Sequence, residues 1–265
     1  MPHSKRLPVA ELQKREEPPQ HEDNLLLNAL SPSVRKFIFP HLKLTELPLG
    51  QALYESGVVI RDIYFPTDSI VALQNEMADG RATEIAVVGN EGVVGFALIM
   101  GGRSTSSRAV VQSAGHAYRL PDRLLKDQFC CHDELHHLLL RYSQALITQV
   151  AQTAVCNRFH SIDQQLCRWL LLSMDRVQGN ELKMTQELIA NLLGVRREGV
   201  TAAACKLAQD GIIRYKRGHI TILDRPELER RSCECYKVVK RESDRLLGHS
   251  SCPQGTAVEP LRLQR

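Results

Sequence analysis

TQELIANLLGVRREGVTAAACKL, residues 185–207, predicts two short helices joined by a tight turn. Thr185 is a good N-cap for a first helix over residues 186–193, because its hydroxyl can accept a hydrogen bond from a free backbone NH. Gly194 follows directly, and glycine enters the left-handed conformation of a helix end without steric penalty. A second helix over residues 196–209 completes a helix-turn-helix, a unit typical of DNA recognition.

The second helix begins with side chains suited to reading base edges. Arginine can bridge O6 and N7 of guanine, and glutamate can accept a hydrogen bond from N4 of cytosine. We therefore expect base contacts from the residues at this end of the helix, namely Arg196, Arg197, Glu198 and Thr201.

Residues 212–222, IIRYKRGHITI, predict two short strands around a basic turn, as in the wing of a winged helix. Lys216, Arg217 and His219 lie in or beside this turn, where they can reach DNA phosphates. The alternative is a helical hairpin with a solvated charged turn and no nucleic-acid partner.

The distribution of charge favours a polyanionic partner for the same part of the chain. The 265 residues carry a net charge of +4, and residues 161–265 hold 18 Lys/Arg against 13 Asp/Glu.

Hydrophobic residues make up 43% and charged residues 24%, which excludes wholesale disorder. No apolar run approaches the roughly 20 residues of a membrane span. Eight cysteines without a dense framework fit a reducing compartment, so we expect a cytoplasmic protein with no membrane partner.

The first half of the chain predicts a different architecture, an antiparallel jelly-roll β-barrel of about 100 residues. Short runs rich in β-branched and apolar residues alternate with turn signals, of which Asp79-Gly80 is the strongest for a hairpin. Two short helices, over residues 24–30 and 34–42, precede these runs. The predicted strands cover residues 42–47, 58–65, 70–76, 81–88, 108–112 and 116–120.

A long helix is expected between these two units. Residues 133–156 contain no proline or glycine, and at about 1.5 Å per residue they would span about 36 Å. Because this outreaches one face of a small barrel, we predict a dimerisation helix whose Leu139, Tyr142 and Leu146 face a partner chain. Gln149 and Thr153 lie on the same stripe and would fix the register of that seam. The alternative is a helix packed on its own sheet.

The sequence thus predicts an α+β chain with an ordered series of segments. Ser161 and Gln164 form a capping box at the start of the helix after the long one. Residues 226–247 are expected to form one further helix. The predicted segments are a disordered tail (1–22), a sensor barrel (23–132), the dimerisation helix (133–157), a winged helix-turn-helix domain (158–225), a C-terminal helix (226–247) and a second disordered tail (248–265).

A small barrel, a long helix and the motif TQELIANLLGVRREGVTAAACKLAQDGIIRYKRGHITI together resemble the cyclic-AMP-receptor/fumarate-nitrate (Crp/Fnr) family of bacterial transcription regulators. The resemblance covers about residues 24–225 and implies a cyclic-nucleotide-binding-like barrel. It implies base reading by Arg197 and Glu198 and phosphate contacts from Thr185 and Gln186. It further implies a homodimer on a near-palindromic double-stranded DNA site, with RNA polymerase as another partner.

The barrel departs from the family's cyclic-nucleotide signature. Members that bind cyclic AMP have a Gly-Glu pair and a later Arg, which hold the ribose and the phosphate. Here Gly95 is followed by Phe96, and Ser107 stands where the arginine belongs. Arg108 is one residue away, and a one-residue shift on a strand points a side chain to the opposite face. We therefore expect an effector other than cyclic AMP. The sequence assigns no cofactor to the barrel.

Metal and catalytic signals are weak in the sequence. Cys130-Cys131 and Cys233-x-Cys235 lack the paired CxxC spacing of a zinc site, and the iron–sulfur members' N-terminal cysteine cluster is missing. His136 and His137 are expected on a solvated helix face, so no metal ligand is assigned. No catalytic motif stands out, so an enzyme is not expected. The alternatives are a redox-, metal- or haem-responsive sensor acting through cysteines or histidines, and a cyclic-nucleotide-binding module without DNA activity.

Overall fold

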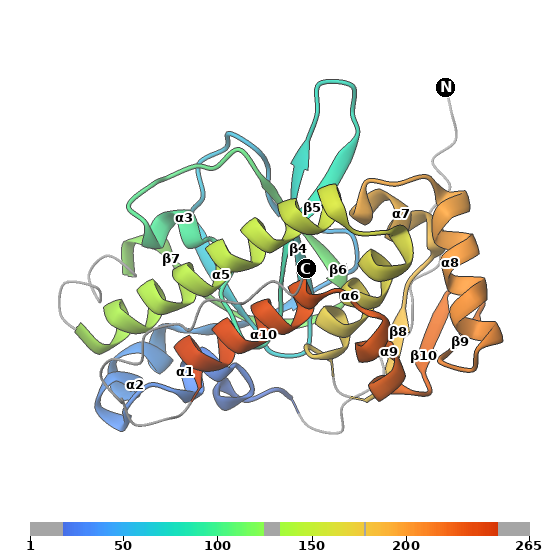
Figure 1. Cartoon of the computed structure of the whole chain (residues 1–265). Coiled ribbons are helices and arrows are strands. Elements are labelled where there is room, and N and C mark those ends of the chain that lie inside the picture. Colours follow the sequence, from blue (N-terminus) through green and yellow to red (C-terminus); the bar gives the residue numbers. More distant parts are fainter. Residues whose placement is uncertain (1–17, 125–132, 178, 249–265) are drawn as a thin grey trace.

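Two antiparallel sheets form the N-terminal half of the chain in the computed structural model, which describes residues 18–124, 133–177 and 179–248 (Figure 1). One sheet has the strand order β1-β7-β3 and the other β2-β6-β4-β5, and their inner faces share one apolar core. The predicted barrel is confirmed, with one short strand, β2, that the sequence did not indicate. The strands are β1 (Lys43–Leu47), β2 (Ala52–Tyr54), β3 (Asp62–Pro66), β4 (Ile70–Glu76), β5 (Ala82–Val88), β6 (Arg108–Ser113) and β7 (Gly115–Pro121).

Residues 18–22, which the sequence analysis assigned to a disordered tail, pack against the barrel. The Tyr118 hydroxyl donates to the carbonyl of Pro19 at 2.7 Å, and the His21 ring stacks on Phe39 and Tyr118. The predicted disordered tail over residues 1–22 is therefore wrong for residues 18–22, because aromatic packing holds them on the barrel. The helices of this region are η1 (His21–Asp23), α1 (Leu25–Asn28), α2 (Pro32–Ile38) and η2 (Phe39–His41).

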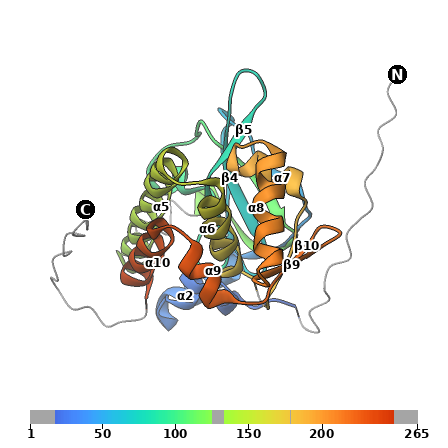
Figure 2. The same cartoon turned by 45° about the vertical axis from the view of Figure 1, so that its right-hand side comes forward.

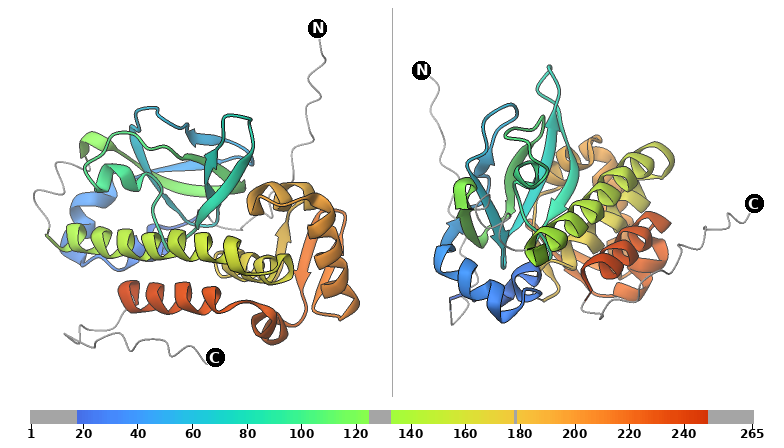
Figure 3. Two further views of the ribbon diagram at one scale, coloured as in Figure 1. Left: turned by 45° about the horizontal axis from the view of Figure 1, so that its top comes forward. Right: turned by 90° about the vertical axis from the view of Figure 1, so that its left-hand side faces the viewer.

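Helix α5 (Asp133–Phe159) is the predicted long helix, and it lies along the barrel (Figure 3). Leu139, Tyr142 and Leu146 are only 0%, 3% and 3% exposed within a single chain, where they join the barrel core. The prediction that they face a partner chain is therefore wrong. Gln149 is also turned inward, since its side-chain amide bonds both the NH and the carbonyl of Val87 on β5.

The outward face of α5 carries a second stripe. Its members are exposed and repeat at alternating spacings of three and four residues, as in a coiled-coil seam. Ile147, the largest apolar side chain at its centre, is 57% exposed. The stripe consists of Leu140, Gln144, Ile147, Ala151 and Ala154.

The C-terminal half has the predicted winged helix-turn-helix. Ser161 and Gln164 form the expected capping box at the start of the first helix. A short strand, β8, was not predicted, and it completes a sheet of order β8-β10-β9. No helix in the described ranges combines the length and apolarity needed to cross a membrane. The elements are α6 (Ile162–Met174), β8 (Glu181–Lys183), α7 (Gln186–Leu193), α8 (Arg197–Gln209), β9 (Ile213–Lys216) and β10 (His219–Ile222).

The single helix predicted over residues 226–247 is two helices, α9 (Arg225–Arg231) and α10 (Glu234–Leu247). Extended backbone at Ser232 and Cys233 separates them, and the Ser232 hydroxyl donates to a carbonyl of the last turn of α9. The break lets α10 return beside α5, where Gln144 Nε2 donates to Glu242 Oε1 at 3.2 Å (Figures 2 and 3).

Candidate functional site

The two helices of the helix-turn-helix are held as the sequence predicted. The Thr185 hydroxyl accepts a hydrogen bond from the NH of Leu188 at 3.2 Å and so caps α7. Gly194 ends α7 with a φ of +66°. Buried side chains of both helices, Ile189, Leu193 and Val200 among them, fill the space between α6, α7 and α8.

The start of α8 presents charged side chains to solvent. Arg196, the N-cap residue, and Arg197 and Glu198 in the first turn are all exposed. Thr201 lies one turn later, and its hydroxyl bonds Gln186 Oε1 at 2.8 Å. This hydrogen bond joins α8 to α7. It also fixes the two side chains, so neither is free to turn toward DNA without breaking it.

The wing supplies a second basic surface. Lys216, the last residue of β9, and Arg217, in the turn between β9 and β10, are both exposed, and Arg217 adopts a φ of 50°. In the described part of the chain, neither they nor Arg196 and Arg197 take part in a salt bridge. His219 differs, because its Nδ1 pairs with the carboxylate of Glu181 on β8. A carboxylate at this position repels phosphate, so the structure does not favour the predicted phosphate contact of His219.

The winged helix-turn-helix, residues 162–222, packs against the outside of the barrel. The Thr83 hydroxyl of β5 donates to the carbonyl of Leu192 on α7 at 3.3 Å. Arg176, just beyond α6, pairs with Glu91 of the barrel at 2.7 Å, and both side chains are largely buried. The barrel and the winged helix-turn-helix therefore share one interface.

Glu84 on β5 is buried in that interface. Burial raises the pKa of its carboxyl to about 7, although the charges of Arg168 and Arg176 and the indole of Trp169 oppose this rise. One carboxyl oxygen of Glu84 has no hydrogen-bond partner among the described residues. Near neutral pH the interface therefore contains a carboxyl group close to its titration midpoint.

A cavity of about 360 Å³ lies between the barrel, helix α3 (Phe96–Ile99) and α5. Phe96 and Ser107 line it at the positions where the sequence predicts the degenerate effector pocket. Ile147 and Ala151 close it from α5, and no charged side chain is among its described lining residues. Gly95 begins α3 with a φ of +100°, and a side chain there would press on the backbone of β3.

Arg108 points away from this cavity. Its guanidinium pairs with Glu55 at 3.2 Å and Glu76 at 3.5 Å, whereas the neighbouring Ser107 is buried and lines the cavity. The irregular register between β4 and β6 occurs at Ile70 and Val71, at the other end of the pairing. Ser107 and Arg108 therefore point to opposite faces of the strand, as the sequence predicted.

Some of the cysteines and histidines lie together in the fold. Cys130 and Cys131 lie outside the described residues, and His136 and His137 stack on one another on α5 with ring centroids 5.9 Å apart. Cys233 and Cys235 are buried at the start of α10. Two side chains that the sequence reading did not select lie beside them, Cys156 and His160. A sequence separation of 77 positions between Cys156 and Cys233 hides this proximity in the sequence.

Comparisons with known proteins agree with this geometry. Residues 164–231 match the family model described as a Crp-like helix-turn-helix domain. The CRP-like cAMP-activated global transcriptional regulator of Mycobacterium tuberculosis is 22% identical over 214 residues, which cover 78% of this chain and 96% of that protein.

Solved structures show the same fold. FixK2 from Bradyrhizobium japonicum superimposes with a TM-score of 0.62 at 16% identity, over 72% of this chain and 98% of that one. A putative Crp/Fnr-family transcriptional regulator from Eubacterium rectale gives a TM-score of 0.60 at 20% identity, over 77% and 96% of the two chains.

Proposed function

We propose that this chain is a transcription regulator of the Crp/Fnr type and that it binds a near-palindromic site in double-stranded DNA as a homodimer. The observation that carries this proposal is the pair of exposed arginines at the start of α8 beside the basic turn of the wing. Two copies with their α8 helices about 34 Å apart would enter successive major grooves of one face of DNA. RNA polymerase is the further partner that we propose.

Each exposed group has its own role in this proposal. Arg196, Arg197 and Glu198 read base edges in the major groove. Lys216 and Arg217 contact phosphates, which adds affinity without sequence preference. The capped start of α7, at Thr185 and Gln186, lies beside the backbone of the duplex. Thr201 acts through Gln186 by holding the two helices in register.

The outward stripe of α5 is the proposed dimer seam. A parallel copy would bury Leu140, Ile147 and Ala151, which occupy a and d positions of a heptad pattern. Ile147 and Ala151 also line the cavity of the barrel. A ligand there would therefore touch the seam and could change how the two copies pack, which is how we propose that the effector acts.

We further propose that the effector is not cyclic AMP. Phe96 offers no acceptor for a ribose hydroxyl, and a buried polar group without a partner costs about 1–3 kcal/mol. Arg108 is paired with two glutamates instead of facing the cavity. Calorimetry with cyclic AMP on the purified protein should detect no micromolar binding. Micromolar binding that disappears in Arg108→Ala would contradict this proposal.

The DNA interface is tested by titrating matched and scrambled duplexes at several salt concentrations. Arg197→Ala should cost about 1–3 kcal/mol on the matched duplex and much less on the scrambled one. Lys216→Ala should weaken binding to both duplexes similarly and reduce the salt dependence. The charge-matched control is Arg241→Ala, on the exposed face of α10, which should bind as the wild type does. Equal losses on both duplexes for Arg197→Ala would exclude base reading by this residue.

A further inference from the structure

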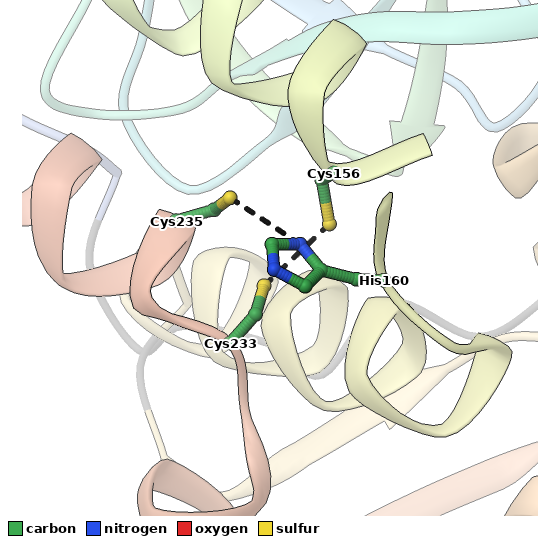
Figure 4. Close-up of side chains that lie close together, drawn as sticks. All are labelled: Cys156, His160, Cys233 and Cys235. Atoms are coloured by element: carbon green, nitrogen blue, oxygen red, sulfur yellow. Dashed lines mark hydrogen bonds between the residues drawn. The ribbon is translucent and has the colours of Figure 1, made fainter. Parts of the chain in front are cut away.

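Four metal-ligating side chains converge where α5 ends and α10 begins (Figure 4). They are Cys156, His160, Cys233 and Cys235, and their ligand atoms all lie within 4.8 Å of one another. The Sγ atoms of Cys156 and Cys233 are 3.5 Å apart, and His160 Nδ1 lies 3.6 Å from Cys235 Sγ. We propose that these residues bind one tetrahedral divalent metal ion of the zinc type through three thiolates and an imidazole.

The Cys156–Cys233 and His160–Cys235 distances fit a single ion. Tetrahedral zinc with Zn–S bonds of about 2.3 Å and Zn–N bonds of about 2.0 Å holds neighbouring ligand atoms about 3.5–3.8 Å apart. A disulfide would bring two sulfurs to about 2.0 Å, so Cys156 and Cys233 are free thiols. A two-iron cluster requires its terminal ligands on opposite irons to lie farther apart than this group allows. Cys₃His is also a common ligand set of structural zinc sites.

The imidazole is oriented for this role. His160 Nε2 lies 3.3 Å from the carboxylate of Glu234, and its side chain is only 12% exposed. A ligating histidine typically donates its second ring NH to a carboxylate, which fixes the tautomer. That contact leaves the lone pair of Nδ1, which points toward the sulfurs, for the ion.

The surroundings of the sulfurs are typical of a closed site. Cys156, Cys233 and Cys235 are 0–3% exposed and form a buried cluster of their own. Three thiolates and a neutral imidazole would leave a net charge of −1 around a divalent ion. The guanidinium of Arg168 is buried nearby, where it donates to Thr153 Oγ1 one turn before Cys156 and offsets that charge.

The four proposed ligands flank the DNA-binding region in the sequence. Cys156 and His160 immediately precede the DNA-binding region matched over residues 164–231, and Cys233 and Cys235 immediately follow it. One ion would therefore join the two ends of the DNA-binding unit to the C-terminal end of α5. The inference goes beyond the proposed function, because metal binding at this place requires neither DNA nor an effector.

The test uses the full-length reduced protein, stripped of metal and titrated with Co²⁺ alone. Thiolate-to-cobalt charge-transfer absorption in the near ultraviolet and intense visible bands of tetrahedral Co²⁺ should saturate at one ion per chain, and Zn²⁺ should abolish both. Cys156→Ser and Cys235→Ser should lose the tight binding. Cys205→Ser, at an exposed free thiol on α8, is the matched control and should behave as the wild type does.

A fourth variant, at Glu234, tests how the ligand His160 is held. Glu234→Ala should retain one ion per chain but bind it about tenfold to a hundredfold more weakly, because Glu234 only positions the ligand His160. Wild-type protein that gives no thiolate–cobalt band would overturn the proposal, as would a band retained in Cys156→Ser. A Cys156–Cys233 disulfide found by mass spectrometry of protein never exposed to oxidants, or an iron–sulfur chromophore, would also overturn it. None of these results depends on whether the protein binds DNA.

Discussion

At the scale of single residues, Glu84 predicts how stability depends on pH. Burial raises the pKa of its carboxyl to about 7 in the folded chain, from an ordinary value of 4.5. An acid whose pKa is raised by folding destabilises the folded state as pH rises above the unfolded pKa, and the full penalty is reached above the folded pKa. Glu84→Gln should therefore raise the free energy of unfolding by about 3 kcal/mol at pH 8 and hardly change it at pH 4.

Urea unfolding at a series of pH values measures this difference. Glu46→Gln, at an exposed position on β1, is the control and should leave the curve unchanged. If the advantage of Glu84→Gln is the same at pH 4 and pH 8, the carboxyl does not titrate in the interface.

The sequence was sufficient to predict the residues that carry the DNA-binding unit. Thr185 and Gly194 impose a cap and a left-handed helix end whatever surrounds them, so α7 has its predicted bounds. The pairing of His219 with Glu181 could not be predicted, because Glu181 belongs to a three-residue strand too short to show a periodic pattern. The Cys₃His group was missed because its two halves come together only through tertiary folding.

At the scale of elements, α5 shows why one long helix is hard to orient from its sequence. It carries two stripes at helical spacing, one through Leu139 and Leu146 and another through Leu140 and Ile147. The barrel of the same chain covers the first stripe. A pattern of spacing therefore predicts the helix and its length but does not distinguish a core-facing stripe from a partner-facing one.

The second stripe leads to a prediction about the oligomeric state. Ile147→Asp places a charge at the centre of the proposed seam while leaving the barrel core intact, so light scattering should report monomers with a native circular dichroism spectrum. Leu49→Asp makes the same kind of change at another exposed apolar position, in the turn between β1 and β2, and should stay dimeric. Dimers of unchanged affinity in Ile147→Asp would exclude this face of α5 as the seam.

At the scale of the whole molecule, the ion pair between Arg176 and Glu91 joins the two units. Glu91→Gln would leave a buried guanidinium without its counter-charge, which costs about 3 kcal/mol. Fluorescence of Trp169, the only tryptophan, reports on the interface, and far-ultraviolet circular dichroism reports on the whole chain. We expect the two urea transitions to coincide in the wild type and to separate in Glu91→Gln.

The control for this prediction is Asp163→Asn, which removes one partner of the exposed pair with Lys206. Exposed pairs contribute about 0–1 kcal/mol, so its transitions should remain coincident. Coincident transitions at an unchanged midpoint in Glu91→Gln would mean that the apolar contacts alone hold the two units together.

The return of α10 along α5 has a consequence for the spacing of target sites. A reading unit attached to its dimer through one linker can swing to follow half-sites that move apart, at a small entropic cost. Here the chain leaves α5 at one end of the reading unit and comes back to α5 from the other, so the unit is attached twice. Inserting one or two base pairs between the half-sites should therefore be tolerated poorly, and the genome should contain operators of nearly uniform length.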